Sequence, residues 1–281
     1  MPQASSFVSF RPWLLPWAVP LIAGGMADVF LLPFPLERLA FPVNLIVLVV
    51  LLVGTILAYG YGKSSRWWRR WTAATTSGSL IAAFGICTLG LAFFPELRLQ
   101  HSWSFNALLL TLLCQLLAVI LNYRGAFRLR FYANHIGLWL LLASLSLGEA
   151  DHYQLRAAAK VGDQISEAYN QWGELQPLGY EVRVTDFTVD YHENGSPQQY
   201  TCALRINDSP HLLQVNHPVA ISWKEDLYVV DCGPLDRHQY YCVLEAKVQP
   251  WQSVTLVGLL LTVVGALLLF IGKQKGGPHV A

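Results

Sequence analysis

Six long apolar stretches constrain the fold of this chain more than any other feature of its sequence. A helix needs about 20 mostly apolar residues to cross a hydrocarbon core roughly 30 Å thick. We predict membrane spans over Leu14 to Leu36, Val43 to Tyr61, Ala74 to Phe94, Phe105 to Leu121, Tyr132 to Gly148 and Val254 to Ile271. The chain is 54% apolar and only 13% charged, and average soluble domains carry about twice that charged share. The composition therefore agrees with an integral membrane protein.

The first apolar stretch contains Pro16, Pro20, Gly24, Gly25 and Asp28. Proline and glycine favour a kinked helix over a simple straight anchor. A cleaved signal peptide is the competing interpretation, but the stretch is long and lacks a tidy small-residue cleavage site. Asp28 is expected either within the membrane or close to the outer end of a broken helix.

The short loops that hold Lys and Arg predict the orientation of the spans. Basic side chains follow the second, fourth and sixth spans, and loops rich in Lys and Arg face the cytoplasm. These residues are Lys63, Arg66, Arg69, Arg70, Arg124, Arg128, Arg130, Lys273 and Lys275. Both termini are therefore predicted in the cytoplasm, and the long segment between the fifth and sixth spans is predicted on the outer side.

That outer segment has the alternating pattern of β-strands. In residues 180–191 every second side chain is apolar, so that the apolar side chains share a buried face, with a shift at Asp186. Residues 200–206 alternate again. Asn194 and Gly195 lie between these runs, so the pattern predicts a hairpin. Further strands are expected at 212–216, 227–231 and 240–248, while 154–169 suits either a strand or a short helix.

Together these patterns predict an α-helical integral membrane protein with about six transmembrane helices and one extracytoplasmic, mainly β domain before the last helix. Residues 1–62 hold two transmembrane helices and residues 63–148 hold three more. Residues 149–252 form the β-rich domain, and residues 253–281 form the last helix and a short cytoplasmic tail.

Charge and cysteine content exclude several classes of function. The net charge of +1, from 19 basic and 18 acidic residues, gives no overall field that would attract nucleic acid. None of the five cysteines forms a C-x-x-C motif, which argues against a zinc knuckle or a thioredoxin-type dithiol. Cys202, Cys232 and Cys242 fall in the outer segment, where disulfides persist. A Cys232–Cys242 bridge is slightly favoured because it closes a short loop, but spacing does not fix the pairing.

From about Thr75 onward, an ordered set of short motifs resembles the ResB (also called CcsB) family of cytochrome c biogenesis proteins. The motifs are Phe93-Phe94-Pro95, Ser102-Trp103, Asn134-His135-Ile136-Gly137-Leu138, Asp186-Phe187, Asn194-Gly195, Val215-Asn216-His217-Pro218 and Pro250-Trp251, followed by Gly258 and Gly265. Their order around one large outer domain carries the resemblance. The chain departs from the family in having two additional N-terminal helices, residues 1–62, and a short outer domain.

The resemblance implies a multi-pass protein of the bacterial cytoplasmic (inner) membrane that works with a CcsA-type membrane protein carrying a WWD motif. Such a pair moves haem b outward and attaches it to apocytochrome c. This chain has no WWD motif, so the resemblance implies the non-catalytic half of a synthase. The expected partners are the CcsA-type protein, apocytochrome c, haem and membrane lipid, with no nucleic acid.

His135 is the residue that we expect to bind haem, as an axial ligand to the iron. It opens the fifth predicted span directly after a basic loop, and ionisable residues inside spans tend to mark a pathway or site. Imidazole is a usual axial ligand of haem iron. Position alone favours a different interpretation, a neutral interfacial histidine hydrogen-bonded to a neighbouring helix or a lipid headgroup. The family resemblance raises the haem-ligand interpretation to the same level as this one.

The basic loop before His135 supplies a second, weaker set of site residues. Arg124, Arg128 and Arg130 have the charge to pair with haem propionates, although setting the topology explains them without any ligand. His217 is expected to play a structural role in a turn. His101 is expected in the outer loop, either solvated or facing haem.

Two other classes of function stay open at this point. The chain is alternatively a membrane-anchored extracytoplasmic binding or sensor module, or a transporter of another small molecule. Charged residues are almost absent from the predicted spans and the hydropathy pattern has no repeat that would suggest inverted halves, which argues against the transporter. Haem absorption in the purified protein would separate the first interpretation from both alternatives.

Overall fold

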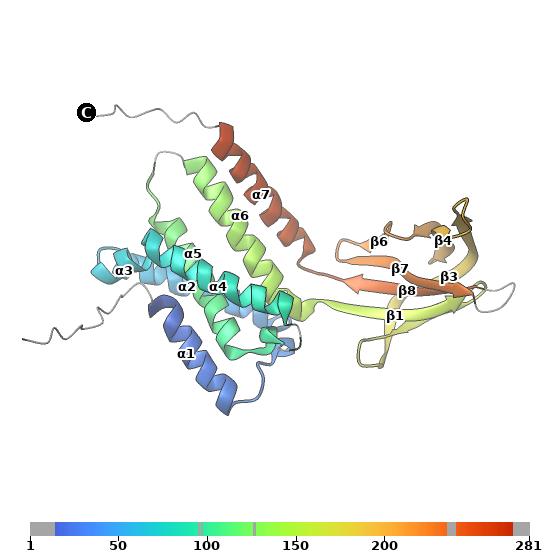
Figure 1. Ribbon diagram of the computed structural model, residues 1–281, viewed down its shortest axis with the longest axis horizontal. Coiled ribbons are helices and arrows are strands. Elements are labelled where there is room, and N and C mark those ends of the chain that lie inside the picture. Colours follow the sequence, from blue (N-terminus) through green and yellow to red (C-terminus); the bar gives the residue numbers. More distant parts are fainter. Residues whose placement is uncertain (1–14, 95, 97, 126–127, 235–239, 272–281) are drawn as a thin grey trace, which may run out of the picture. The chain divides into compact units, whose positions relative to one another are not determined.

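A computed structural model describes residues 15–94, 96, 98–125, 128–234 and 240–271 (Figure 1). Pro95, Lys273 and Lys275 lie outside these residues, and the side chain of Arg128 is likewise not described. The chain divides into two compact units. One consists of helices from residues up to Ala150 and from Val254 onward, and the other is formed by Asp151–Ser253.

The helical unit contains seven α-helices within the described residues. Their bounds are α1 Leu15–Phe30, α2 Val43–Gly62, α3 Arg66–Trp71, α4 Ala74–Phe93, α5 Trp103–Asn122, α6 Arg128–Leu147 and α7 Gln252–Ile271. Short 3-10 turns lie at η2 Leu36–Leu39, η4 Leu99–His101 and η5 Glu149–Asp151. All six apolar stretches are therefore largely helical where they are described, and α3 is a short additional helix in the loop after the second stretch.

Three helices of the described chain, Val43–Gly62, Trp103–Asn122 and Gln252–Phe270, are long and apolar enough to cross a membrane. This supports a membrane protein, but the prediction of six spans is not confirmed. The apolar parts of α1 and α4, Pro16–Phe30 and Ala74–Gly90, are shorter than this length. The helix α6 does not qualify, and polar residues such as Arg128 and Arg130 occupy its first turns.

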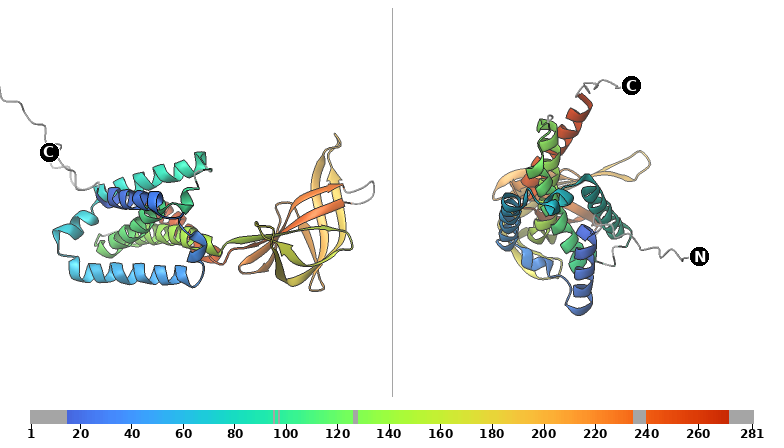
Figure 2. Two further views of the ribbon diagram at one scale, coloured as in Figure 1. Left: turned by 90° about the horizontal axis from the view of Figure 1, so that it is seen from below. Right: turned by 90° about the vertical axis from the view of Figure 1, so that its left-hand side faces the viewer.

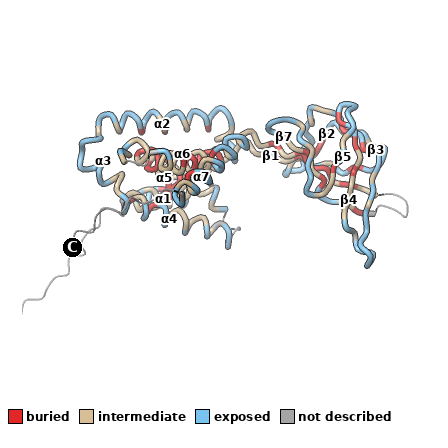
Figure 3. The backbone as a smooth tube through the Cα atoms, turned by 90° about the horizontal axis from the view of Figure 1, so that it is seen from above, coloured by how far each residue is buried: buried red, intermediate tan, exposed pale blue. Residues whose placement is uncertain are grey.

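Helix α5 forms the centre of the helical unit. Over its most apolar window 56% is buried, against 17% for α2 and 11% for α7, and Figure 3 shows α2 exposed along most of its length. Leucines of α5 pack against Leu51 of α2 and Trp139 of α6. The most deeply buried amide of α5, Gln115, donates to the Trp71 carbonyl and to the Ser77 hydroxyl, so burial leaves this polar group satisfied.

Helix α1 is fixed against α5 by a glycine and a carboxylate. A Cβ at Gly24 would collide with the backbone of Ser104, so only glycine permits this close approach of the two helices. The Asp28 carboxylate accepts hydrogen bonds from the backbone N–H groups of Trp103 and Ser104, at 2.5 and 3.2 Å. These N–H groups lie in the first turn of α5, where a helix has unpaired donors and favours negative charge.

The second unit is a single antiparallel sheet of eight strands in the order β5-β4-β3-β2-β1-β8-β7-β6. The strands are β1 Tyr153–Lys160, β2 Gln164–Tyr169, β3 Leu175–Tyr191, β4 Pro197–Ile206, β5 Ser209–Gln214, β6 Val219–Ser222, β7 Glu225–Pro234 and β8 Tyr240–Val248. The edge strand β5 also contacts β6 and β7, so the sheet curls upon itself, as Figure 2 shows. Inward-facing side chains of most strands share one apolar core.

The strands confirm the expected mainly β domain and settle its ambiguous part. Residues 154–169 form two strands, β1 and β2, separated by a turn in which Gly162 has φ +97°. The hairpin predicted around Asn194 and Gly195 joins β3 to β4. Gly195 has φ +79°, a conformation that costs glycine little because it lacks a Cβ.

The bend expected at Asp186 is a β-bulge. The pairing of β3 with β4 shifts register between Val184 and Asp186, which changes the face to which the following side chains point. The Asp186 carboxylate accepts a hydrogen bond from the backbone N–H of Phe187 at 2.8 Å. The alternation in the sequence therefore located both the strand and its irregularity.

Candidate functional site around His135

One face of α6 carries small residues that bring α7 into close contact. A Cβ added at Gly137 would lie 2.6 Å from the Thr262 backbone nitrogen and 2.8 Å from the Gly258 carbonyl oxygen. A Cβ at Gly265 would lie 2.6 Å from the backbone nitrogen of Asn134. Real Cβ atoms do not approach other atoms so closely, so the crossing requires glycine on both helices, as in other close helix pairs of membrane proteins. Figure 1 shows α6 and α7 side by side.

His135 lies on a different face of the same helix. One residue corresponds to about 100° of rotation around a helix axis, so His135 points away from the direction of Asn134. Its face also carries Phe131 and Trp139, at the i−4 and i+4 positions. The Trp139 indole is buried and donates to the Leu113 carbonyl of α5 at 3.0 Å, while the His135 side chain is half-buried.

The hydrogen bond of the His135 ring determines which nitrogen carries the proton. Nδ1 lies 2.9 Å from the Phe131 carbonyl oxygen, and a carbonyl can only accept. In the neutral ring Nδ1 must therefore be the N–H donor, and Nε2 keeps its lone pair. Within the described residues no protein group is hydrogen-bonded to Nε2. A histidine that donates one N–H to a backbone carbonyl and presents its other nitrogen has the usual arrangement of a metal ligand.

Aromatic rings hold the imidazole in place. The His135 ring stacks on Phe131, with 3.8 Å between ring centroids, and Tyr123 stacks on the same phenylalanine at 3.5 Å. Tyr132 lies edge-on to both Phe131 and Tyr123. These rings come from the end of α5 and the start of α6, so they join the two helices on either side of the basic loop.

The three arginines have different surroundings. Arg124 directly follows Tyr123 and is exposed. Arg130 is half-buried and already takes part in an interaction within the protein. The Arg128 side chain lies outside the described residues. Of the predicted cationic groups, Arg124 is thus the one whose described side chain is most open to solvent and to a ligand.

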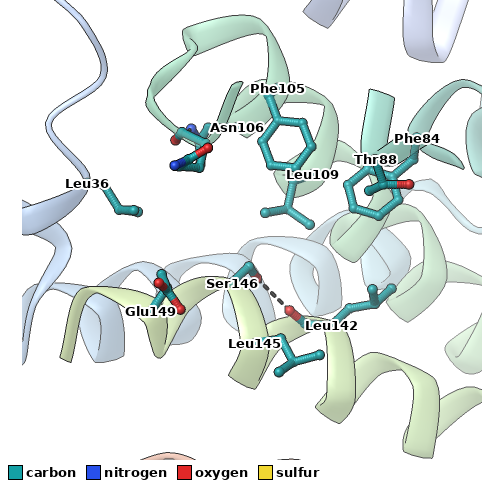
Figure 4. Close-up of a pocket in the computed structure, with 11 residues that line it drawn as sticks. Leu36, Phe84, Thr88, Phe105, Asn106, Leu109, Leu142, Leu145, Ser146 and Glu149 are labelled. Carbon is teal, nitrogen blue, oxygen red and sulfur yellow. Dashed lines mark hydrogen bonds between the residues drawn. The ribbon is translucent and has the colours of Figure 1, made fainter. Parts of the chain in front are cut away.

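A separate cavity of about 430 Å³ lies between α4, α5 and α6 and is lined by Leu36, Phe84, Thr88, Gln100, Phe105, Asn106, Leu109, Leu142, Leu145, Ser146 and Glu149. Figure 4 shows Phe105 and Leu109 opposite Leu142 and Leu145. None of the lining residues is histidine, methionine, cysteine or tyrosine, the side chains that ligate haem iron. The cavity begins about two helical turns beyond His135, so it does not include the predicted ligand.

The other residues singled out in the sequence have structural surroundings. Nδ1 of His101 lies 3.3 Å from the Phe34 carbonyl oxygen, which ties η4 to the segment between α1 and η2. His217 is exposed, and its backbone N–H, not its ring, closes a turn to the Gln214 carbonyl. Asn216 in the same turn has φ +65°, which asparagine tolerates better than most residues. Asp28 caps α5, as described above.

Among the motif histidines, His217 is exposed in a turn, whereas the ring of His135 is half-buried, oriented by its Nδ1 hydrogen bond and stacked on Phe131. The sequence did not single out Phe131, Tyr123 or Trp139 as parts of the site. Only the i−4 and i+4 spacing of Phe131 and Trp139 from His135 could have indicated them.

Comparison with known proteins gives one family. Residues 119–233 match the ResB-like family, which confirms the resemblance inferred from the motifs. Among solved structures, the chain is similar to "Cytochrome c Heme Lyase CcmF" with 12% identity and a TM-score of 0.38, over 80% of this chain and 45% of that one. The chain therefore spans less than half the length of that protein. No curated protein matches the sequence.

Proposed function

From the ResB-like match of residues 119–233, we propose that this chain is a membrane subunit of a cytochrome c biogenesis system and handles haem together with a CcsA-type partner. The observation that carries the haem part of the proposal is the Nδ1 hydrogen bond of His135 to the Phe131 carbonyl. This bond leaves Nε2 as the nitrogen that could ligate iron.

The surroundings of His135 fit a haem ligand in three respects. Nδ1 is used by the hydrogen bond to the Phe131 carbonyl, so Nε2 is the ring nitrogen that is free to face iron. Flat aromatic rings stack beside it, which suits a planar ligand. Arg124 is exposed in the adjoining loop, where its guanidinium could pair with a propionate.

In this proposal Nε2 of His135 would hold the iron that haem supplies when it is bound, and a second ligand would come from this chain or from the partner. The protein's own part is to orient the imidazole through the Nδ1 hydrogen bond, which leaves Nε2 without a protein partner among the described residues, and to pair cationic groups with the carboxylates of the ligand. The sheet domain is proposed to contact the partner or apocytochrome c. Attachment itself is assigned to the partner, because this chain lacks a WWD motif.

The proposal includes a topology in which the basic loops are cytoplasmic and the sheet domain lies on the outer, periplasmic side. Reporter fusions at Ser65, Gly125 and Gly276 should then report the cytoplasm, and fusions at Gln100 and Gly195 should report the outside. The excess of Lys and Arg after α2 and α5 supports this orientation. A cytoplasmic report at Gly195 would refute it.

The test of haem ligation is a His135→Gly variant of the full chain, purified alone and with its partner. We expect lower haem occupancy in reduced-minus-oxidised spectra and lower c-type cytochrome yield, with the protein still in the membrane. Added imidazole should restore part of both, because it can fill the vacated coordination position.

The matched control is His217→Ala, which removes an exposed histidine of the sheet unit and should leave the haem content unchanged. Full haem content and full cytochrome maturation in His135→Gly would make His135 an interfacial residue only. Haem in neither the wild-type chain nor its complex would instead favour a binding or sensor module.

A further inference from the structure

Three cysteines of the sheet unit come together although they belong to three strands. Cys202 lies in β4, Cys232 in β7 and Cys242 in β8. Cys202 and Cys242 are 0% and 2% exposed and belong to the apolar core, and Cys232 packs against that core while half-buried. The fold therefore brings three thiols into or beside one apolar core.

The curl of the sheet creates this cluster. Three strands, β3, β2 and β1, lie between β4 and β8 in the sheet. A flat sheet would therefore hold Cys202 and Cys242 well apart, since neighbouring strands are spaced by about 4.8 Å. Their sulfur atoms are nevertheless 3.8 Å apart. The two side chains therefore meet across the interior of the curled sheet.

Cys232 has a different relation to Cys242. The two are directly opposite on the neighbouring antiparallel strands β7 and β8, which the ladder hydrogen bonds already hold together. A bond between them would join strands that need no further link. A bond from Cys202 to Cys242 would instead join β4, near one edge of the sheet, to β8, with three strands between them in the sheet order. Apart from the shared core, these two parts of the curled sheet meet where β5 contacts β6 and β7.

We propose that Cys202 and Cys242 form a disulfide that fastens the curled sheet, and that Cys232 remains a thiol. The proposal rests on the outer location that the proposed topology gives to the sheet unit, where disulfides persist, and not on haem binding. The oxidant is a disulfide-containing oxidoreductase or small-molecule disulfide.

The chemistry is a balanced exchange. One of the two thiolates attacks the oxidant's disulfide and releases one of its sulfurs as a thiol, which leaves a mixed disulfide. The second thiolate then attacks the mixed disulfide and releases the oxidant's other thiol. The two cysteines lose two electrons and two protons, and the oxidant gains both. Because both thiols are buried in the folded unit, the exchange takes place while the sheet is still closing.

The electrostatic surroundings agree with Cys232 as the unreacted thiol. Burial, followed by the nearby Cys242 and Asp231, raises the pKa of Cys232 to about 12, and the protonated thiol is a poor nucleophile. Within the Cys202–Cys242 pair, the shared hydrogen bond and burial raise the pKa of Cys202, whereas the same hydrogen bond lowers the pKa of Cys242, so Cys242 is the member of the pair that more readily forms a thiolate. Cys232 is the thiol left over once these two are joined, and in its protonated form it attacks their disulfide only slowly.

The test is a map of thiols in the full chain taken directly from cells. Acid quenching stops exchange, N-ethylmaleimide under denaturing conditions labels free thiols, and a distinguishable label follows reduction. We expect Cys202 and Cys242 to take only the second label and to appear as one linked peptide pair, with Cys232 taking the first. Cys87 and Cys114, both free in the helical unit, should also take the first label and show that denaturation was complete.

Two variants complete the design. Cys232→Ser should keep the linked peptide, and Cys202→Ser should abolish it and leave Cys242 open to the first label. First-stage labelling of all three thiols, or a peptide linking Cys232 to Cys242, would overturn the proposal. The mapping of the wild-type chain decides the question even where a variant folds poorly. An outside report at Gly195 combined with three free thiols would refute the disulfide alone and leave the haem proposal intact.

Discussion

The two faces of α6 compared above differ in what fills them. Toward α7, Asn134 and Gly137 meet Gly265, Gly258 and Thr262 at backbone contact. A second link lies further along this pair, where the Thr255 hydroxyl of α7 donates to the Ser144 hydroxyl at 2.9 Å. Backbone atoms of the neighbouring helix occupy the space beside these glycines, so no ligand fits between the two helices there.

On the other face, rings take the place of glycines and the contacts are side chain to side chain. His135 is held by one bond to its own helix and by stacking on Phe131. The adjacent residues Asn134 and His135 therefore differ in role, since Asn134 packs against α7 and His135 presents a ring nitrogen. The close packing of one face fixes the position of α6, which allows the other face to keep a ring nitrogen unpaired at little structural cost. This is how a fold can support a site without building it into the core.

The largest expected loss of stability comes from a substitution on the face of α6 that packs against α7. Gly137→Val places a branched side chain against the Thr262 nitrogen and the Gly258 carbonyl, which are backbone atoms and cannot turn aside. Overpacking a well-packed site costs about 1–3 kcal/mol, and we expect the upper end here, seen as a lower thermal midpoint and lower yield in detergent.

The matched control for this substitution is Gly54→Ala on α2, where an added Cβ has no neighbour within 4 Å. In a helix interior alanine is favoured over glycine by about 0.5–1 kcal/mol, so this variant should be as stable as the parent or more so. If both glycine variants had the same thermal midpoint as the parent, the close crossing of α6 and α7 would be wrong.

The next effect concerns the face that carries His135. Trp139→Phe keeps most of the apolar ring but removes the bond from the indole N–H to the Leu113 carbonyl. A hydrogen bond of this kind contributes about 0.5–1.5 kcal/mol, so we expect a loss of about 1 kcal/mol. Thermal unfolding measures the loss, and haem content should stay at the parental level. A loss of haem without a loss of stability would mean that Trp139 touches the ligand.

The features that could be predicted from the sequence are those that depend on residues close together along the chain. Alternation over residues 180–206 located the β3–β4 hairpin and its bulge, because the side-chain period of a strand and the φ of a turn glycine are local properties. The helical stretches were found for the same reason. Their number as spans could not be confirmed, since α6 begins with arginines and the apolar parts of α1 and α4 are short.

Features that join distant parts of the chain were not predictable from spacing. The preferred Cys232–Cys242 pair followed from closeness in sequence, whereas the curl of the sheet brings the sulfurs of Cys202 and Cys242 together, and all five cysteines are free thiols in this structure. Asp28 was expected inside the membrane or near a helix end, and only the packing of α1 on α5 showed that it caps another helix. The glycines of α7 were noted as motif residues without their partners on α6.

The smallest expected effect on stability is at His135 itself, and it is the most informative of the three. His135→Ala removes a bond to the carbonyl of Phe131, which belongs to the same helix, and a stacking contact of a half-buried ring. Alanine has the highest helix propensity, which offsets part of this loss. We therefore expect this substitution to lower the thermal midpoint of the haem-free protein by less than Trp139→Phe lowers it. The expected loss of stability is about 0.5 kcal/mol or less. The same substitution should remove most of the haem if Nε2 is a ligand. Of the variants in this series, His135→Ala is therefore the one in which haem content falls strongly while the thermal midpoint hardly changes. A haem-free His135→Ala protein destabilised as strongly as Gly137→Val would show that the imidazole is part of the packed core, and the contrast between the two faces of α6 would then fail.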